Sequence, residues 1–307
     1  DLSAQEDSPL GLEFGDNGKK LYVVGNNNNS VFQYGLGTPF EIDTASFQKS
    51  LDVSSFETSP ESVAFNDDGT KIYIVGAASD TVIQYGLTTA FEIDTASFEK
   101  SFSVANEVQV GTGVEFKDHG TKMYVSGAFN NSINQYGLTT AFEIDTASFE
   151  KSFDASAEVS FAQEVKFDDT ATKMHVLSGN SEIIAQYSLS TALEIDTASF
   201  DKSFSVAGQD TSPKGLAFGD FGKKVYIAGD ANDKIFQYSI DTVLDSIDII
   251  ALHQHSTGTV EASIVSQDDI SLERENLGLG NVPNEDATNP ANWDQDGAAD
   301  ADQLRWS

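Results

Sequence analysis

The side chains of this chain that are best suited to bind a ligand are amides and carboxylates in recurring short turns. At one point of each 51-residue repeat the sequence reads NNNNS, AASDT, AFNNS, GNSEI or DANDK. Their oxygens and amide groups can pair with sugar hydroxyls. The candidate ligand-binding residues are Asn26, Asn27, Asn28, Asn29, Asp80, Asn130, Asn131, Asn180 and Asp230. The alternative, that Asn and Asp stand there only because they suit turns, stays open.

A second set of carboxylates has the spacing of a metal site. The segment NWDQDGAADADQ, residues 292–303, partly matches a calcium loop, with Asp294, Asp296 and Asp300 as candidate ligands. Gln303 stands where such loops carry a bidentate Glu, and Asn292 where they carry Asp. An Asp-rich tail without an ion is the alternative. Apart from Ca²⁺ at this segment, we expect no cofactor.

Motifs for catalysis are missing from the sequence. It has no nucleotide-binding loop, no nucleophile elbow and no HExxH zinc site, and it contains no cysteine. His253 and His255 have strand spacing and could share a metal across the axis of a homotrimer. Catalysis needs one asymmetric pocket, whereas this chain is nearly repetitive, so we expect no enzymatic activity. A glycosidase, which needs a pair of carboxylates, is the enzymatic alternative.

Three sequence tracks recur at the same fixed interval, without an insertion or deletion between them. Gln-Tyr occurs at Gln33-Tyr34, Gln84-Tyr85, Gln135-Tyr136, Gln186-Tyr187 and Gln237-Tyr238. FEIDTASFQKS begins at Phe40 and recurs with small changes at Phe91, Phe142 and Leu193. The third track, KLYVVG and its copies, is centred on Tyr22, Tyr73, Tyr124, His175 and Tyr226. Self-similarity near this period, built from short strands, predicts a β-propeller, with a solenoid of β-hairpins as the alternative.

The second repeat shows what one blade contains. Strands are expected at residues 62–65, 72–76, 81–87 and 97–104, and the Asp-Gly turn at residues 66–71 predicts a hairpin. The expected fold is therefore an all-β, five-bladed propeller with four antiparallel strands per blade, at residues 1–254. Residues 246–254 would supply the last strand, and the ring would close without an N-terminal strand in the last blade. Residues 255–307 would form a C-terminal connector or fibre-type module.

The repeated residues of a blade have structural interpretations. We expect each Gln of Gln-Tyr to be a buried hydrogen-bonding strut and each Tyr to be a core ring. Lysines at equivalent points of the fourth strand would guard an outer edge or be solvated charges. They are Lys49, Lys100, Lys151 and Lys202. The turns after the first strands barely vary, whereas the Asn/Asp turns at the opposite end do, so we expect the ligand surface at that variable end.

The charge balance excludes some partners. The chain carries 49 acidic and 17 basic residues, a net charge of -32. Such a surface repels nucleic acid and anionic membranes. No segment has the roughly 20 apolar residues of a membrane span, and no signal peptide is visible, so we expect no membrane insertion.

Two segments resemble known proteins. Residues 275–290, ENLGLGNVPNEDATNP, resemble a short motif of bacteriophage tail-fibre and other virion fibre proteins, with Pro283 as a departure. Residues 116–127 followed by 135–149 are similar to repeats of phage and marine-bacterial surface proteins, a likeness that extends over residues 8 to 250. These resemblances imply a display or attachment role and no enzymatic one.

The expected function follows from the repeat and these resemblances. The chain would be a virion structural protein, a tail-fibre or appendage component at the virion or an extracellular surface. Its propeller would contact other virion or surface subunits or host glycans, and a homotrimer is one expected assembly. The alternative is a secreted glycan-binding, lectin-like propeller of a marine bacterium, with up to five equivalent sugar sites.

Overall fold

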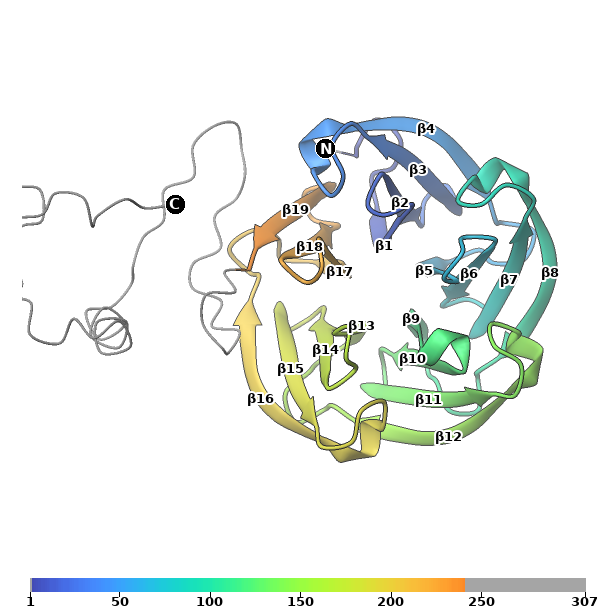
Figure 1. Ribbon diagram of the computed structural model, residues 1–307. Coiled ribbons are helices and arrows are strands. Elements are labelled where there is room, and N and C mark those ends of the chain that lie inside the picture. Colours follow the sequence, from blue (N-terminus) through green and yellow to red (C-terminus); the bar gives the residue numbers. More distant parts are fainter. Residues whose placement is uncertain (1, 241–307) are drawn as a thin grey trace, which may run out of the picture. The chain divides into compact units, whose positions relative to one another are not determined.

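Five β-sheets stand around a common axis in the computed structural model, which describes residues 2–240 (Figure 1). The first blade contains β1 (Pro9–Gly15), β2 (Lys20–Gly25), β3 (Ser30–Leu36) and β4 (Ala45–Asp52). The second contains β5 (Pro60–Phe65), β6 (Lys71–Gly76), β7 (Thr81–Leu87) and β8 (Ala96–Ser103). The third contains β9 (Gly111–Lys117), β10 (Lys122–Gly127), β11 (Ser132–Leu138) and β12 (Ala147–Asp154).

The remaining two blades repeat this order. The fourth contains β13 (Ala162–Phe167), β14 (Lys173–Ser178), β15 (Ile183–Leu189) and β16 (Ala198–Ser205). The fifth contains β17 (Pro213–Gly219), β18 (Lys224–Gly229) and β19 (Lys234–Ser239). Successive strands are antiparallel neighbours in every sheet. The predicted five-bladed propeller is confirmed, while the predicted fourth strand of blade five and the boundary at residue 254 lie outside the described residues.

Short 3₁₀ turns complete the described secondary structure. Four of them precede the outer strands, at η1 (Ile42–Thr44), η2 (Ile93–Thr95), η4 (Ile144–Thr146) and η5 (Ile195–Thr197). The fifth, η3 (Asp118–Gly120), joins β9 to β10. Within residues 2–240, no helix has the length and apolar character that crossing a membrane requires.

The turn between the first and second strands forms as its sequence predicts. In blade two, Gly69 has a φ of 70°, which favours glycine because it has no Cβ. A Cβ at Gly69 would also lie 2.4 Å from ring atoms of Phe91. The side chain of Asn66 accepts a hydrogen bond from the backbone N–H of Lys71 at 2.8 Å, which closes the turn. The loop before the outer strand therefore packs directly on this turn.

The core consists of aromatic and aliphatic layers between neighbouring blades. Tyr73 of blade two is fully buried, and its ring centroid lies 4.3 Å from that of Phe116 in blade three. Tyr124 packs in the same way on Phe167 of blade four, at 4.4 Å. The third track of the repeat thus supplies the side chains that join one blade to the next.

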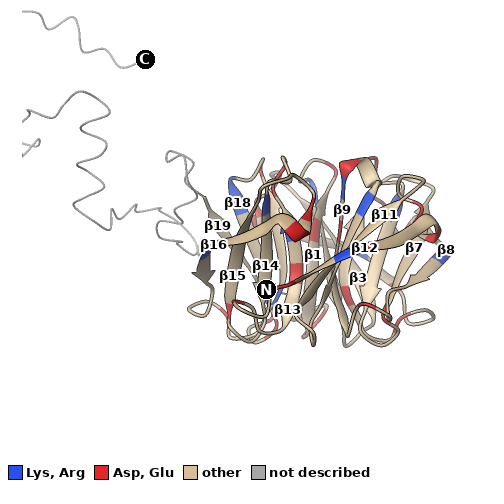
Figure 2. Ribbon diagram, turned by 90° about the horizontal axis from the view of Figure 1, so that it is seen from below, with Lys and Arg blue, Asp and Glu red and all other residues tan. Residues whose placement is uncertain are grey.

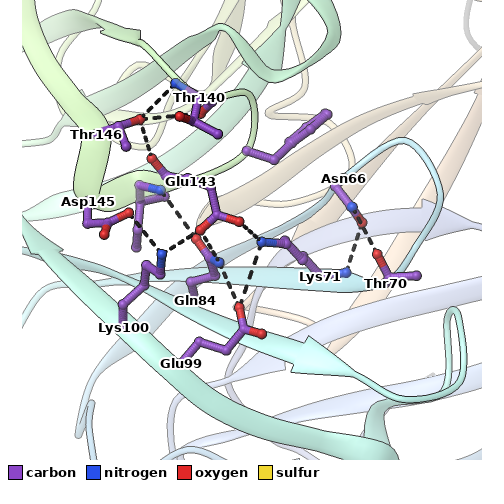
Figure 3. Close-up of polar contacts among 12 residues, drawn as sticks. Asn66, Thr70, Lys71, Gln84, Glu99, Lys100, Thr140, Glu143, Asp145 and Thr146 are labelled. Carbon is purple, nitrogen blue, oxygen red and sulfur yellow. Dashed lines mark hydrogen bonds and ion pairs between the residues drawn. The ribbon is translucent and has the colours of Figure 1, made fainter.

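Polar contacts join the same neighbouring blades nearer the outer edge of the ring (Figure 3). The Tyr73 hydroxyl donates to the Phe142 carbonyl oxygen at 2.8 Å. Gln84, which is fully buried, accepts from the Ile144 backbone N–H at 3.3 Å, so the predicted strut is confirmed. The ammonium group of Lys100 pairs with Glu143 and, at 2.9 Å, with Asp145.

The FEIDTASF segment of one blade therefore binds the preceding blade. Its Glu and Asp pair with lysines, and its Ile is buried between the blades. The hydroxyl of Thr146 donates to the Glu143 carbonyl at 2.8 Å and holds the 3₁₀ turn. The outer-strand lysines, interpreted from sequence as edge guards or solvated charges, make ion pairs between blades at Lys49, Lys100 and Lys151. Neither interpretation included that role.

The ring closes between blades five and one with the same contacts. The Tyr226 hydroxyl donates to the Phe40 carbonyl at 2.6 Å, and the Ile42 N–H donates to the Gln237 side chain at 3.2 Å. The N–H of Leu2 donates to the Asp233 carbonyl at 2.9 Å, as Val53 does to Asn29. Blade five is thus joined to blade one by the same tyrosine and glutamine contacts that join blades one to two, two to three and three to four.

Candidate functional site

The Asn and Asp residues predicted to bind ligand mostly hold loops in place. Asn28 donates to the Gln5 carbonyl at 3.0 Å, and Asp80 accepts from the Gly111 N–H at 3.0 Å. Asn131 accepts from the Phe161 N–H at 2.6 Å. Asn130 donates to the Glu107 carbonyl at 3.0 Å. These contacts tie the turn between the second and third strands to a loop that enters a blade.

The other predicted residues make similar contacts. Asn27 donates to Asp7 at 2.5 Å. The backbone N–H groups of Asn180 and Asp230 each donate to a serine carbonyl at 3.1 Å. Asn29, like Asp80 and Asn131, has a positive φ. The residues lie on turns of five different blades, and their binding of a ligand stays a prediction.

The predicted calcium ligands Asp294, Asp296 and Asp300 lie outside the described residues, as do His253 and His255. Among residues 2–240, no group of three or more His, Asp or Glu side chains is arranged to hold a metal ion.

The blades differ in the charge that they place at the axis, where their first strands stand side by side (Figure 1). One position of the first strand is occupied in turn by Glu13, Ala64, Glu115, Lys166 and Ala217. The Lys166 ammonium lies 2.8 Å from a carboxylate oxygen of Glu13 and 3.0 Å from one of Glu115. Because blades four and one are not neighbours, the Lys166–Glu13 pair spans the centre of the ring.

The axial charges are strongly coupled. Burial opposes the charge of Lys166, but the carboxylates of Glu115 and Glu13 outweigh it and raise the pKa of Lys166 well above its ordinary value. Burial also opposes ionisation of Glu115, yet Lys166 and Lys117 lower its pKa. At Glu13 burial prevails and raises the pKa. The layer is therefore held by a charged lysine and an ionised Glu115.

A second polar layer lies two residues earlier on each first strand, at Gly11, Ser62, Gly113, Glu164 and Gly215. Glu164 is fully buried and accepts a hydrogen bond from the Ser62 hydroxyl of blade two at 2.8 Å, again across the axis. Its Oε1 has no hydrogen-bond partner within the described part of the chain. A Cβ at Gly113 would lie 2.5 Å from that oxygen, so glycine makes room for it. Burial raises the pKa of Glu164 to about 8.

A cavity of about 320 Å³ opens at the axis between blades one, two and three, on the side of the turns after the first strands. It is lined by Glu13, Phe14, Gly15, Asp16, Asn17, Ala64, Phe65, Asn66, Asp67, Phe91, Glu115 and Phe116. Four of these residues carry carboxylates, four are phenylalanines, and none is Lys or Arg. At the exposed rim, His119 Nδ1 lies 3.0 Å from the Asp67 carboxylate. In a side view, acidic residues occur at both ends of the ring (Figure 2).

This cavity lies at the opposite end of the blades from the ligand surface that the sequence favoured. The sequence-based prediction rested on the turns and not on the first strands, whose GLEF, SVAF, GVEF, EVKF and GLAF differ in polarity at the first and third positions. The signal was present: the third position carries Glu, Ala, Glu, Lys and Ala in turn, while the fourth is Phe in all five blades.

Comparisons with known proteins found no match in sequence and only distant likenesses in structure. No family model and no curated protein matches the chain. A protein of unknown function from Desulfotomaculum acetoxidans is 12% identical, with a TM-score of 0.49, over 76% of this chain and 82% of that one. A candidate 6-phosphogluconolactonase from Bacteroides uniformis is 11% identical, with a TM-score of 0.48, over 79% and 69%. A Lactobacillus plantarum protein is 11% identical, with a TM-score of 0.48, over 81% and 70%.

The class of protein rests on the chain's own geometry. It is a five-bladed β-propeller with one asymmetric, charged axis inside a frame of nearly identical blades. At the identities above, the similar structures carry no information on activity or ligand.

Proposed function

We propose that this propeller is a non-enzymatic attachment module, a structural subunit of a virion appendage such as a tail fibre or of another extracellular surface. The observation that supports it best is the contrast between the repeated frame and the single asymmetric axis. A rigid scaffold that carries a distinctive cavity at an exposed end suits recognition. Its partners would be host-surface groups at that end and other virion or surface subunits elsewhere, in a homotrimer or another assembly.

The state of the axial charges favours binding over catalysis. The Lys166 ammonium is engaged by two carboxylates and keeps its proton, so it is a poor nucleophile. Glu164, whose raised pKa would suit a general acid or base, is fully buried. A general base must come within hydrogen-bond reach of the proton that it removes. These groups therefore stabilise the ring and set the charge of the cavity.

The test of the attachment role combines localisation with competition. Gold-labelled antibodies against the ring are applied to native particles and cells of the source, and purified chain is added to an adsorption assay. The proposal expects gold on an appendage or outer surface and a concentration-dependent block of adsorption by the free chain. Label confined to the cell interior, or adsorption that is indifferent to the chain, contradicts the proposal.

A glycan-binding propeller is the second candidate, and one exposed aromatic pair favours it. The rings of Phe56 and Phe98 stack at 4.0 Å with an interplanar angle of 5°. They are 46% and 40% exposed. Flat aromatic surfaces of this kind can pack on the apolar face of a sugar ring. Glycan binding that disappears in Phe56→Ala and persists in Phe129→Ala, another exposed phenylalanine, would support this candidate.

A further inference from the structure

The walls of the axial cavity combine aromatic rings with negative charge. Phe65 and Phe116 line it from equivalent positions of blades two and three, and Phe91 lines it from the loop before β8. Aromatic faces carry negative electrostatic potential and attract cations. The volume, about 320 Å³, is at the small end of the range for ligand pockets.

The charges of the cavity are not balanced by the protein. Glu13 and Glu115 share the single ammonium of Lys166, and Lys117 adds a second contact to Glu115 at 3.1 Å. Asp16 and Asp67 at the rim add two more carboxylates to the lining. A cation that enters the cavity therefore meets an excess of negative charge close to low-dielectric walls, where attraction is stronger than in bulk water.

The layer beneath places one more buried carboxyl group at the axis. Glu164 is fully buried, and its Oε1 receives no hydrogen bond from any described residue. Buried carboxyl oxygens are ordinarily paired, because leaving one without a partner costs free energy. Glu164 is also linked electrostatically to Lys166, Glu115 and Glu13.

We propose that the axial cavity binds a small organic cation that carries an alkylammonium group, as on an amino- or choline-substituted surface polymer. The phenylalanines would contact the methyl or methylene groups around the nitrogen, and the carboxylates would supply the opposing charge. Anionic ligands are excluded by the same carboxylates, and a neutral sugar gains nothing from them. This assignment deepens the proposed function, on which it rests for the choice of the axial end as the binding surface.

The experiment titrates the full chain with choline and follows binding by NMR and calorimetry. The matched control ligand is 3,3-dimethylbutan-1-ol, which has the shape of choline without the charge, and acetate tests for anion binding. Choline is expected to bind at least about tenfold more tightly than its neutral isostere, since both the carboxylates and the rings favour a charge. Equal binding of the two, or no binding of choline, overturns the assignment.

Variants separate the cavity from the general acidity of the chain. Asp67→Asn at the exposed rim and Phe116→Leu in the wall are expected to weaken choline binding, the latter about 2- to 30-fold. Asp52→Asn removes the same charge from the exposed end of β4, outside the cavity lining, and is expected to leave binding unchanged. Thermal unfolding confirms that each variant is folded. Equal weakening by Asp52→Asn and Asp67→Asn would mean that only net charge attracts choline, which contradicts a built site.

The two proposals fail in different ways. A chain that binds choline in the cavity but neither labels a surface nor blocks adsorption refutes the attachment role and keeps the cation site. A chain that blocks adsorption without binding choline, ethanolamine or any other ammonium probe refutes the cation site alone.

Discussion

The hydroxyl of Tyr226 in blade five donates a hydrogen bond to the carbonyl oxygen of Phe40 in blade one, at 2.6 Å. The same bond joins blades one and two at Tyr22, at 2.7 Å, and blades two and three at Tyr73, at 2.8 Å. The junction that closes the ring therefore carries the same tyrosine–carbonyl hydrogen bond as these two junctions within it. A frame that is closed in this way can hold an asymmetric axis without distortion of any one blade.

Removal of the hydroxyl tests this closure. Tyr226→Phe and Tyr73→Phe are each expected to lower the free energy of unfolding by about 0.5–1.5 kcal/mol, because each leaves a carbonyl without its donor. Urea unfolding of both variants gives the comparison. A ring that is open between blades five and one would be destabilised by Tyr73→Phe and left unchanged by Tyr226→Phe.

Loss of the buried glutamine's hydrogen bond should lower the free energy of unfolding more than loss of the tyrosine hydroxyl does. Gln84→Leu keeps the approximate volume but leaves the N–H of Ile144, a fully buried residue, without its acceptor. We expect a loss of about 1–3 kcal/mol in the free energy of unfolding. Gln209→Leu, on a loop residue whose side chain makes no such link within residues 2–240, serves as the control. Similar urea midpoints for Gln84→Leu and the unmodified chain would refute the strut.

Acid should loosen the junctions between the blades. Hydrogen bonds from Lys100 and Lys71 lower the pKa of Glu143 to about 2, from an ordinary value of 4.5. A carboxyl with a lowered pKa in the folded state stabilises the fold above 4.5, and this contribution is lost as pH falls from 4.5 to 2. The melting temperature should fall in that window, and less steeply for Glu143→Gln. An identical pH profile for the variant would show that Glu143 does not contribute.

The opposite dependence of stability on pH is expected from Glu164. Burial raises its pKa to about 8, so the folded state favours the protonated form. A raised carboxyl pKa means that stability is present below the unfolded value of 4.5 and is lost as pH rises to 8. Glu164→Gln mimics the protonated form, and its stability relative to the unmodified chain should rise between pH 5 and pH 8 and then level off. Urea unfolding at pH 5, 7 and 9 measures this, and a difference that is independent of pH contradicts it.

The repeat predicted the repeated part of the fold well, because the copies of each residue in the five blades could be compared with one another. Five copies of Gln-Tyr indicated a strut and a core ring, and Gln84 confirms the strut. The partner of Lys100 could not be predicted, because periodicity does not say that the loop with Glu143 reaches the preceding blade. The contacts at the axis were still harder to predict, because Glu13 and Lys166 meet only when the ring closes around its centre. A comparison of first strands would have shown their unequal charges but not their contact.

The central claim is that the ligand is recognised at the one asymmetric axis. The most direct test is the position of bound choline in a crystal structure of the chain. We expect one cation per chain, among Phe65, Phe116 and Glu115 at the end of the inner strands. Choline absent from that cavity, and bound instead at the turns of several blades around Asn28 or Asp80, would contradict the account.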